Sequence, residues 1–177
     1  IKSFVSVLGE VLRGRGVERA AFVAPHKNAS GPTSDEDPWL EPSDHNVLRL
    51  KPVSVSLQTL GELASESLVT DEPRALIVLD ASRVVADPAR LSDEESALFR
   101  DIRRTAERQS RIINDNDDEI FSPIIWVVEH ERDLPYWYTA RSPRLRAIAV
   151  PPPHYGQRLA AAKRMVSILT TQSSDPA

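Results

Sequence analysis

Apolar runs of strand length recur along the chain, and amphipathic stretches separate them. The most continuous run extends from Ala75 to Leu79, opens after a proline and an arginine, and closes on Asp80. An aliphatic run without a polar break is typical of a strand that helices cover on both faces. The strands predicted from such runs are residues 17–24, 46–51, 74–80, 121–128 and 145–150.

Helical spacing of apolar positions predicts helices among these strands. Ser54 or Ser56 can cap one helix, and Ser92 with Glu95 forms a capping box for another. Because strands alternate with helices, the sequence predicts an α/β fold of three αβα layers around a mainly parallel sheet of five strands. The predicted helices are residues 1–13, 57–68, 92–109 and 155–169.

A long polar segment, residues 26–45, interrupts the alternation of strands and helices. Prolines at positions 32, 38 and 42 prevent a regular helix, so the segment is predicted to be a loop. Trp39 and Leu40 are its apolar anchor, which we expect to pack back on the domain.

Composition narrows the classes of function. The chain of 177 residues suits one domain, predicted over residues 1–170, with residues 171–177 as a polar tail or linker. It has no cysteine, which excludes a disulfide framework and a thiolate zinc site and fits a cytoplasmic protein. The formal net charge of -4 argues against a nucleic-acid partner, and no apolar run approaches the roughly 20 residues of a membrane span. The chain begins at Ile1 without a methionine, so we expect a piece of a longer protein.

Candidate chemistry lies where the predicted strands end, because open parallel sheets bind ligands outside the carboxyl ends of their strands. Asp80 ends the most continuous strand, where it is either a functional carboxylate or the cap of a turn. Glu129, His130 and Glu131 end a later strand and offer metal ligands or a general base, with a solvated turn as the alternative.

The C-terminal half of the chain resembles the core of AAA-type ATPases. Arg141 and Arg144 precede the apolar run 145–150 and three prolines, as paired arginines precede the last core strand and a proline-containing turn in that family. Residues 75–80 look like a Walker B strand and residues 124–129 like a sensor-1 strand.

This resemblance implies roles for the matching residues. Asp80 takes the Walker B position, where a carboxylate holds the Mg²⁺ of bound ATP through water. Glu129 takes the neighbourhood of sensor 1, beside the nucleotide. Arg141 and Arg144 take the arginine-finger positions, which reach the γ-phosphate in a neighbouring subunit.

The sequence also departs from the family pattern. Ala81 stands where the family has the glutamate that polarises the attacking water, and no G-x-x-x-x-G-K-[ST] loop occurs. The segment after the first strand keeps only Lys27, Gly31 and Thr33 as fragments of that loop. The chain therefore looks like a degenerate AAA-like copy, placed ahead of a complete ATPase module in a longer chain.

Three hypotheses for function follow. The first is a degenerate AAA-like domain of a cytoplasmic, bacterial-type ATP-binding protein, acting in assembly or partner recognition with little or no ATP hydrolysis and no cofactor. Its partner would be a second copy or another domain of the same chain. The second is an NTPase domain that binds ATP or GTP and Mg²⁺ at Asp80 by an atypical loop. The third is a plain interaction module unrelated to ATPases, with its last strand at the sheet edge instead of beside the first strand.

Overall fold

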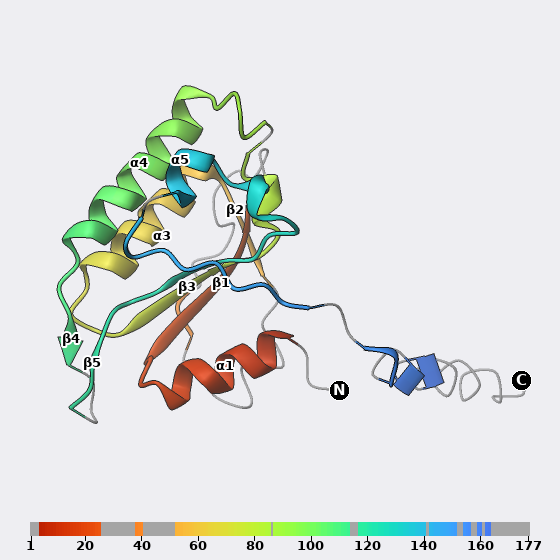
Figure 1. Cartoon of the computed structure of the whole chain (residues 1–177). Coiled ribbons are helices and arrows are strands. Elements are labelled where there is room, and N and C mark those ends of the chain that lie inside the picture. The colour runs from red at the N-terminus through yellow and green to blue at the C-terminus, as the bar shows by residue number, and fades with distance from the viewer. Residues whose placement is uncertain are drawn as a thin grey trace, which may run out of the picture. The chain divides into compact units, whose positions relative to one another are not determined.

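A parallel sheet forms the centre of the structure, which is a computed structural model. The structure describes residues 4–25, 38–40, 52–85, 87–113, 117–140, 142–151, 154–156, 159–160 and 162–163. The strands of this sheet are ordered β2-β1-β3-β6, and every neighbouring pair is parallel (Figure 1). They are β1 (Arg19–Pro25), β2 (Val53–Val55), β3 (Arg74–Val78) and β6 (Ile124–Trp126).

Helices cover both faces of this sheet (Figure 1). One face carries α3 (Leu57–Val69), α4 (Asp93–Arg108) and the short α5 (Tyr136–Thr139). The other face carries α1 (Phe4–Gly14), whose Leu12 packs against β1 and β3. The predicted α/β fold with a parallel sheet between helical layers is confirmed. None of the described helices is long and apolar enough to cross a membrane.

Strand β3 is buried on both faces, as its unbroken apolar run predicts. Leu76 and Val78 point into the cluster under α3 and α4, whereas Ala75 and Ile77 point into the cluster under α1. All four side chains have an exposed fraction of 0%. Two apolar faces on one strand explain why its sequence shows no alternation of polar and apolar residues.

The two helix starts predicted from serine caps are confirmed, whereas most of the helix predicted over residues 155–169 lies outside the described residues. The Thr59 N–H donates to Ser56 Oγ at 3.1 Å and caps α3. At the start of α4 the capping box forms, because the Ser92 N–H donates to Glu95 Oε2 at 2.8 Å and the Glu95 N–H donates to Ser92 Oγ at 3.2 Å. Both caps satisfy backbone donors that the first helical turn leaves without partners.

The predicted loop over residues 26–45 lies outside the described residues apart from 38–40. Trp39 is buried, and Leu40 pairs with Ala20 of β1 in an antiparallel bridge. The predicted packing is confirmed for Trp39, whereas the Leu40 side chain is exposed and only its backbone contacts β1. The strand predicted over residues 46–51 also lies outside the described residues, and β2 begins at Val53.

The prediction of a fifth strand over residues 145–150 is wrong. Those residues form no strand pair, and residues 146–150 are exposed. Both sides of β1 are filled by β2 and β3, so no further strand can pair beside the first one. The chain separates into a unit of residues 2–145 and a unit of residues 146–177 with Ile1, and most of the run falls in the second unit. Instead, β4 (Ile112–Ile113) and β5 (Glu119–Ile120) form a small antiparallel sheet.

An aromatic cluster joins α4, β6 and α5. The ring centroid of Phe99 lies 5.4 Å from that of Trp126 and 4.9 Å from that of Tyr138. The Trp126 Nε1–H donates to Tyr138 Oη at 3.0 Å. Burial raises the pKa of Tyr138 to about 12, because the apolar surroundings disfavour the charged phenolate.

The Tyr138 phenol predicts a loss of stability at high pH. Its contribution is complete below the unfolded pKa of about 10 and is lost as pH rises toward the folded value, at about 1.4 kcal/mol per pH unit. We expect the free energy of unfolding to fall by about 2 to 3 kcal/mol more between pH 10 and 12 in the wild type than in Tyr138→Phe. Urea unfolding followed by tryptophan fluorescence measures this. The exposed Tyr136→Phe should keep the wild-type profile, and equal profiles for wild type and Tyr138→Phe would contradict the prediction.

Candidate functional site

The order of the strands identifies one place on the sheet where ligands are expected. Strand β2 lies on one side of β1 and β3 on the other, so the direction of winding reverses between β1 and β3. Doubly wound sheets bind ligands in the crevice outside the carboxyl ends of the strands at this reversal. Among the described residues, the segment after β3 therefore supplies the candidate site.

Asp80 follows the carboxyl end of β3, as predicted, and the strand order places it at this reversal. Its backbone is left-handed, with φ 50° and ψ 37°. Hydrogen bonds hold its neighbours, since the Leu79 N–H donates to Val23 O at 2.8 Å and the Ala81 N–H donates to Val127 O at 2.9 Å. Asp80 is thus exposed at a fixed point between β1 and the end of β6. Its role in holding Mg²⁺ stays a prediction.

The residue that follows Asp80 in the sequence, Ala81, is buried. Its side chain has an exposed fraction of 0% and belongs to the apolar cluster under α3 and α4. A glutamate at this position would place its charge among apolar side chains, where an unpaired charge is strongly disfavoured. The backbone turn at Asp80 therefore excludes a general base at the next residue.

Glu129 is exposed beyond the end of β6, which is the neighbour of β3, so it lies at the same edge as Asp80. The nearby Asp133 has a structural role, because its Oδ2 accepts a hydrogen bond from the His130 N–H at 2.8 Å. Among the described residues no group of three His, Asp or Glu side chains is arranged to hold a metal ion. The nucleotide-binding role of Glu129 stays a prediction.

Side chains already cap the starts of α3 and α4, the two long helices that begin at this edge among the described residues. At α3, Ser56 Oγ accepts the Thr59 N–H. At α4, Ser92 Oγ accepts the Glu95 N–H, and the Glu95 carboxylate accepts the Ser92 N–H. The first turn of α4 also carries three carboxylates, from Asp93 to Glu95, which repel phosphate. A nucleotide phosphate needs free N–H groups at a helix start, so neither of these two helices offers the usual cradle.

Arg144 lies at the opposite edge of the sheet. Its Nη1 donates to Ala106 O at 2.7 Å and to Gln109 O at 3.0 Å, which are carbonyl groups at the C-terminal end of α4. Its guanidinium also lies 4.7 Å from the centre of the Phe121 ring. An arginine finger acts on a neighbouring subunit, so that role stays a prediction for Arg144. Arg141 lies outside the described residues.

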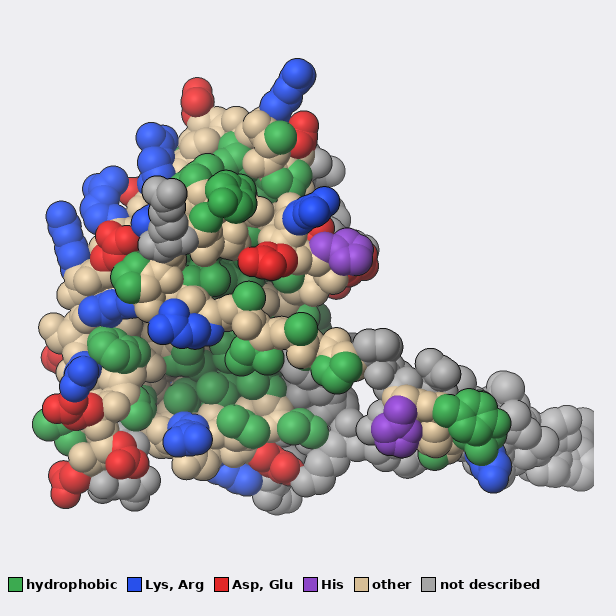
Figure 2. Space-filling view, in the orientation of Figure 1, with side chains coloured by type: hydrophobic (Ala, Val, Ile, Leu, Met, Phe, Trp, Pro, Cys, Tyr) green, Lys and Arg blue, Asp and Glu red, His purple; other side chains and the backbone are tan. Residues whose placement is uncertain are grey.

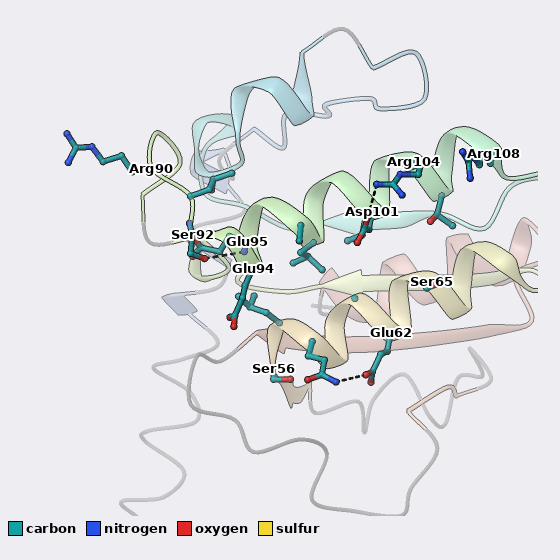
Figure 3. A pocket seen from close by; sticks show the side chains of 18 residues that line it. Ser56, Glu62, Ser65, Arg90, Ser92, Glu94, Glu95, Asp101, Arg104 and Arg108 are labelled. Carbon is teal, nitrogen blue, oxygen red and sulfur yellow. Dashed lines mark hydrogen bonds and ion pairs between the residues drawn. The ribbon is translucent and has the colours of Figure 1, made fainter.

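A groove of about 1380 Å³ runs between α3 and α4 (Figure 3). Leu57, Gly61, Leu98 and Ile102 contribute to its lining. A Cβ atom at Gly61 would lie 3.3 Å from Leu98 Cδ1, so the glycine allows the two helices to approach closely. The sequence did not predict this groove, because the spacing of apolar residues describes each helix separately. The available signal was Gly61, a glycine inside a helical stretch.

Basic side chains gather along the outer side of α4 (Figure 2). Three arginines of this helix, Arg100, Arg104 and Arg108, are exposed, and Arg104 and Arg108 also line the groove. The acidic residues of the same helix lie mainly in its first turn. The helix therefore presents charge of one sign at its start and of the other sign toward its end.

Comparison with known proteins relates the chain to a family of AAA+ proteins. The family model described as "AAA+ chaperone, N-terminal Rossmann-like domain" matches residues 3–151. No curated protein and no solved structure matches the chain significantly. The family match confirms the predicted relation to AAA-type proteins and agrees with the parallel sheet of the structure.

The left-handed backbone at Asp80 predicts an order of stabilities. Alanine is less favourable than aspartate or asparagine in this conformation, so Asp80→Ala should lower the free energy of unfolding by about 1 kcal/mol. Asp80→Asn and Asp80→Gly should remain within about 0.5 kcal/mol of the wild type. Urea unfolding measures the series. An Asp80→Ala variant as stable as Asp80→Asn would contradict a backbone origin of the preference.

The contacts of Arg144 predict a role in holding the end of α4. Arg144→Met keeps an aliphatic chain beside Phe121 but removes both hydrogen bonds, and should lower the free energy of unfolding by about 1 kcal/mol. Hydrogen exchange should become faster in the last turn of α4. Arg132→Met removes an exposed arginine from the other edge and serves as the control. Unchanged exchange in Arg144→Met would contradict this role.

Proposed function

The chain belongs to the family of AAA+ chaperone N-terminal Rossmann-like domains, and from this we propose that it serves partner recognition and assembly without binding nucleotide itself. In this proposal the domain keeps the doubly wound scaffold but not the phosphate site. ATP hydrolysis would then take place outside this domain. We also propose a cytoplasmic location.

One observation carries the proposal: α3 and α4, the two long helices that begin at the ligand edge in the described part of the chain, are capped by their own side chains. Doubly wound folds bind nucleotide phosphate on the free N–H groups of a helix start, after a glycine-rich turn. The capping box of α4 places the Glu95 carboxylate at that position instead. The sequence has no G-x-x-x-x-G-K-[ST] loop to supply the cradle elsewhere.

The carboxylates at the same edge support the proposal. Asp80 and Glu129 are exposed there, and Mg²⁺ in nucleotide sites uses one or two carboxylates together with the phosphates of the nucleotide. Without a cradle for the phosphates, a Mg²⁺ ion at these carboxylates would lack the phosphate ligands that complete such a site. Hydrolysis would in addition need a base, and the position after Asp80 is a buried alanine.

The proposal predicts that nucleotide does not bind. Titration of the 177-residue chain with ATP and Mg²⁺ in a calorimeter should give no binding heat, and phosphate release should stay at the level of the buffer. Asp80→Ala should behave in the same way as the wild type. Asp71→Ala, which removes an exposed carboxylate after α3, is the matched control.

The hypothesis of an NTPase with an atypical loop predicts the opposite result. It requires micromolar binding that Asp80→Ala abolishes and Asp71→Ala preserves. That outcome would overturn the proposed function and assign the Mg²⁺ role to Asp80.

A further inference from the structure

The face of α4 that lines the groove carries a regular pattern of charges (Figure 3). Glu94 lies near the start of the helix, Asp101 near its middle and Arg108 at its end. These positions are spaced by seven residues, which places them on one face of an α-helix. Ala97 and Arg104 also line the groove between them. The face therefore changes from acidic to basic along its length.

The outer charges of this face have no counterpart within the described part of the chain. Glu94 and Arg108 form no ion pair with another described residue. In contrast, Asp101 Oδ1 lies 3.1 Å from Arg104 Nη2, so the central pair is neutralised within the helix. On the rim formed by α3, Glu62 accepts a hydrogen bond from Gln58 Nε2 at 3.0 Å and has no described cationic partner.

This pattern is complementary to itself when one copy of α4 is turned end for end. A two-fold axis near Asp101 is seven residues from both Glu94 and Arg108, so each end of one helix meets the opposite charge of the other. Such an axis gives an interface in which every contact occurs twice. We propose that two copies of the chain associate through the grooves between α3 and α4, with their α4 helices antiparallel.

The rim of α3 fits the same arrangement. A Cβ atom at Gly61 would lie 3.3 Å from Leu98 Cδ1, so Gly61 and the neighbouring Glu62 lie close to the level of Leu98 along α4. Leu98 and Arg104 lie three residues before and after Asp101. A two-fold axis near Asp101 therefore places Leu98 of one copy opposite Arg104 of the other. Glu62 of each copy then faces a guanidinium. Asp101 of each copy lies near the axis with its own Arg104 beside it.

Packing and dipoles favour this antiparallel arrangement. Ala97 is small and half-buried, and with the half-buried Leu57 it gives the contact an apolar surface that another helix can approach. Glu94 to Arg108 spans about 21 Å at 1.5 Å per residue, roughly four helical turns. Antiparallel helices also place the positive start of one dipole beside the negative end of the other.

The order of charges on α4 favours a second copy of the chain as the binding partner. The complementary helix needs basic residues opposite Glu94 and Glu62 and acidic residues opposite Arg108, and α4 itself has this order. The contact consists mainly of exposed charge pairs, each of which is weak and screened by salt. The dimer should therefore be weak and sensitive to ionic strength.

This inference deepens the proposed role in assembly and rests on it. The two tests are independent, because the calorimeter reports nucleotide binding whereas the present test reports mass. Sedimentation of the 177-residue chain at increasing concentration should show a dimer at low salt. Raising the salt concentration about tenfold should weaken association by at least about tenfold, since the Debye length falls to a few ångströms.

Charge reversal tests the surface. Arg108→Glu and Glu94→Arg should each weaken association by at least about tenfold, because each places like charges together twice. The double variant E94R/R108E should restore it to within about threefold of wild type, since the pairs re-form with opposite polarity. Arg100→Glu and Asp93→Arg make the same changes of charge on α4 outside the groove and should leave association unchanged. Circular dichroism verifies that each variant is folded.

Three outcomes would overturn the inference. The first is a wild-type chain that stays monomeric at low salt and high concentration. The second is a dimer that both single reversals leave intact, which would belong to another surface. The third is a double variant that fails to dimerise although it is folded, because self-complementarity requires the exchanged charges to pair.

Discussion

Strand β3 is the constraint on which the domain depends, because it is paired on both edges and buried on both faces. Leu76 is opposite Ala21 of β1 on one side and Ile124 of β6 on the other. A strand in this position has no place for an unpaired polar side chain, so the polar residues of the segment lie at its ends. Arg74 at the entrance pairs with Glu66 and Glu72 and lies 5.4 Å from the centre of the Trp39 ring. Asp80 at the exit marks the reversal of the winding.

The parts of the fold that the sequence predicts are those with a local signal. The unbroken run before Asp80 identifies β3, and four consecutive residues from Ser92 to Glu95 identify the start of α4. The run 145–150 has a similar apolar character but forms no strand, and the place predicted for it beside β1 is filled by β2 and β3. The sheet of β4 and β5 has only two residues per strand, too few for a periodic signal.

In the candidate site, too, the sequence predicts only the features that have a local signal. The position of Asp80 at a ligand edge follows from the strand pattern alone, whereas its left-handed backbone and the burial of Ala81 depend on hydrogen bonds to β1 and to the segment after β6. The serine caps are visible in the sequence, but only the structure shows that α3 and α4 begin at the same edge of the sheet. The contact of Arg144 with Ala106 spans 38 residues and leaves no local trace.

The position of Arg144 makes two of its possible tasks mutually exclusive. A guanidinium that reaches toward a neighbouring subunit must leave the two carbonyl groups at the end of α4 and the Phe121 ring. The last turn of that helix would lose its cationic cap at that moment. Contact with a neighbour through this arginine would therefore be coupled to fraying of a helix end, and hydrogen exchange in that turn would report whether the subunits are engaged.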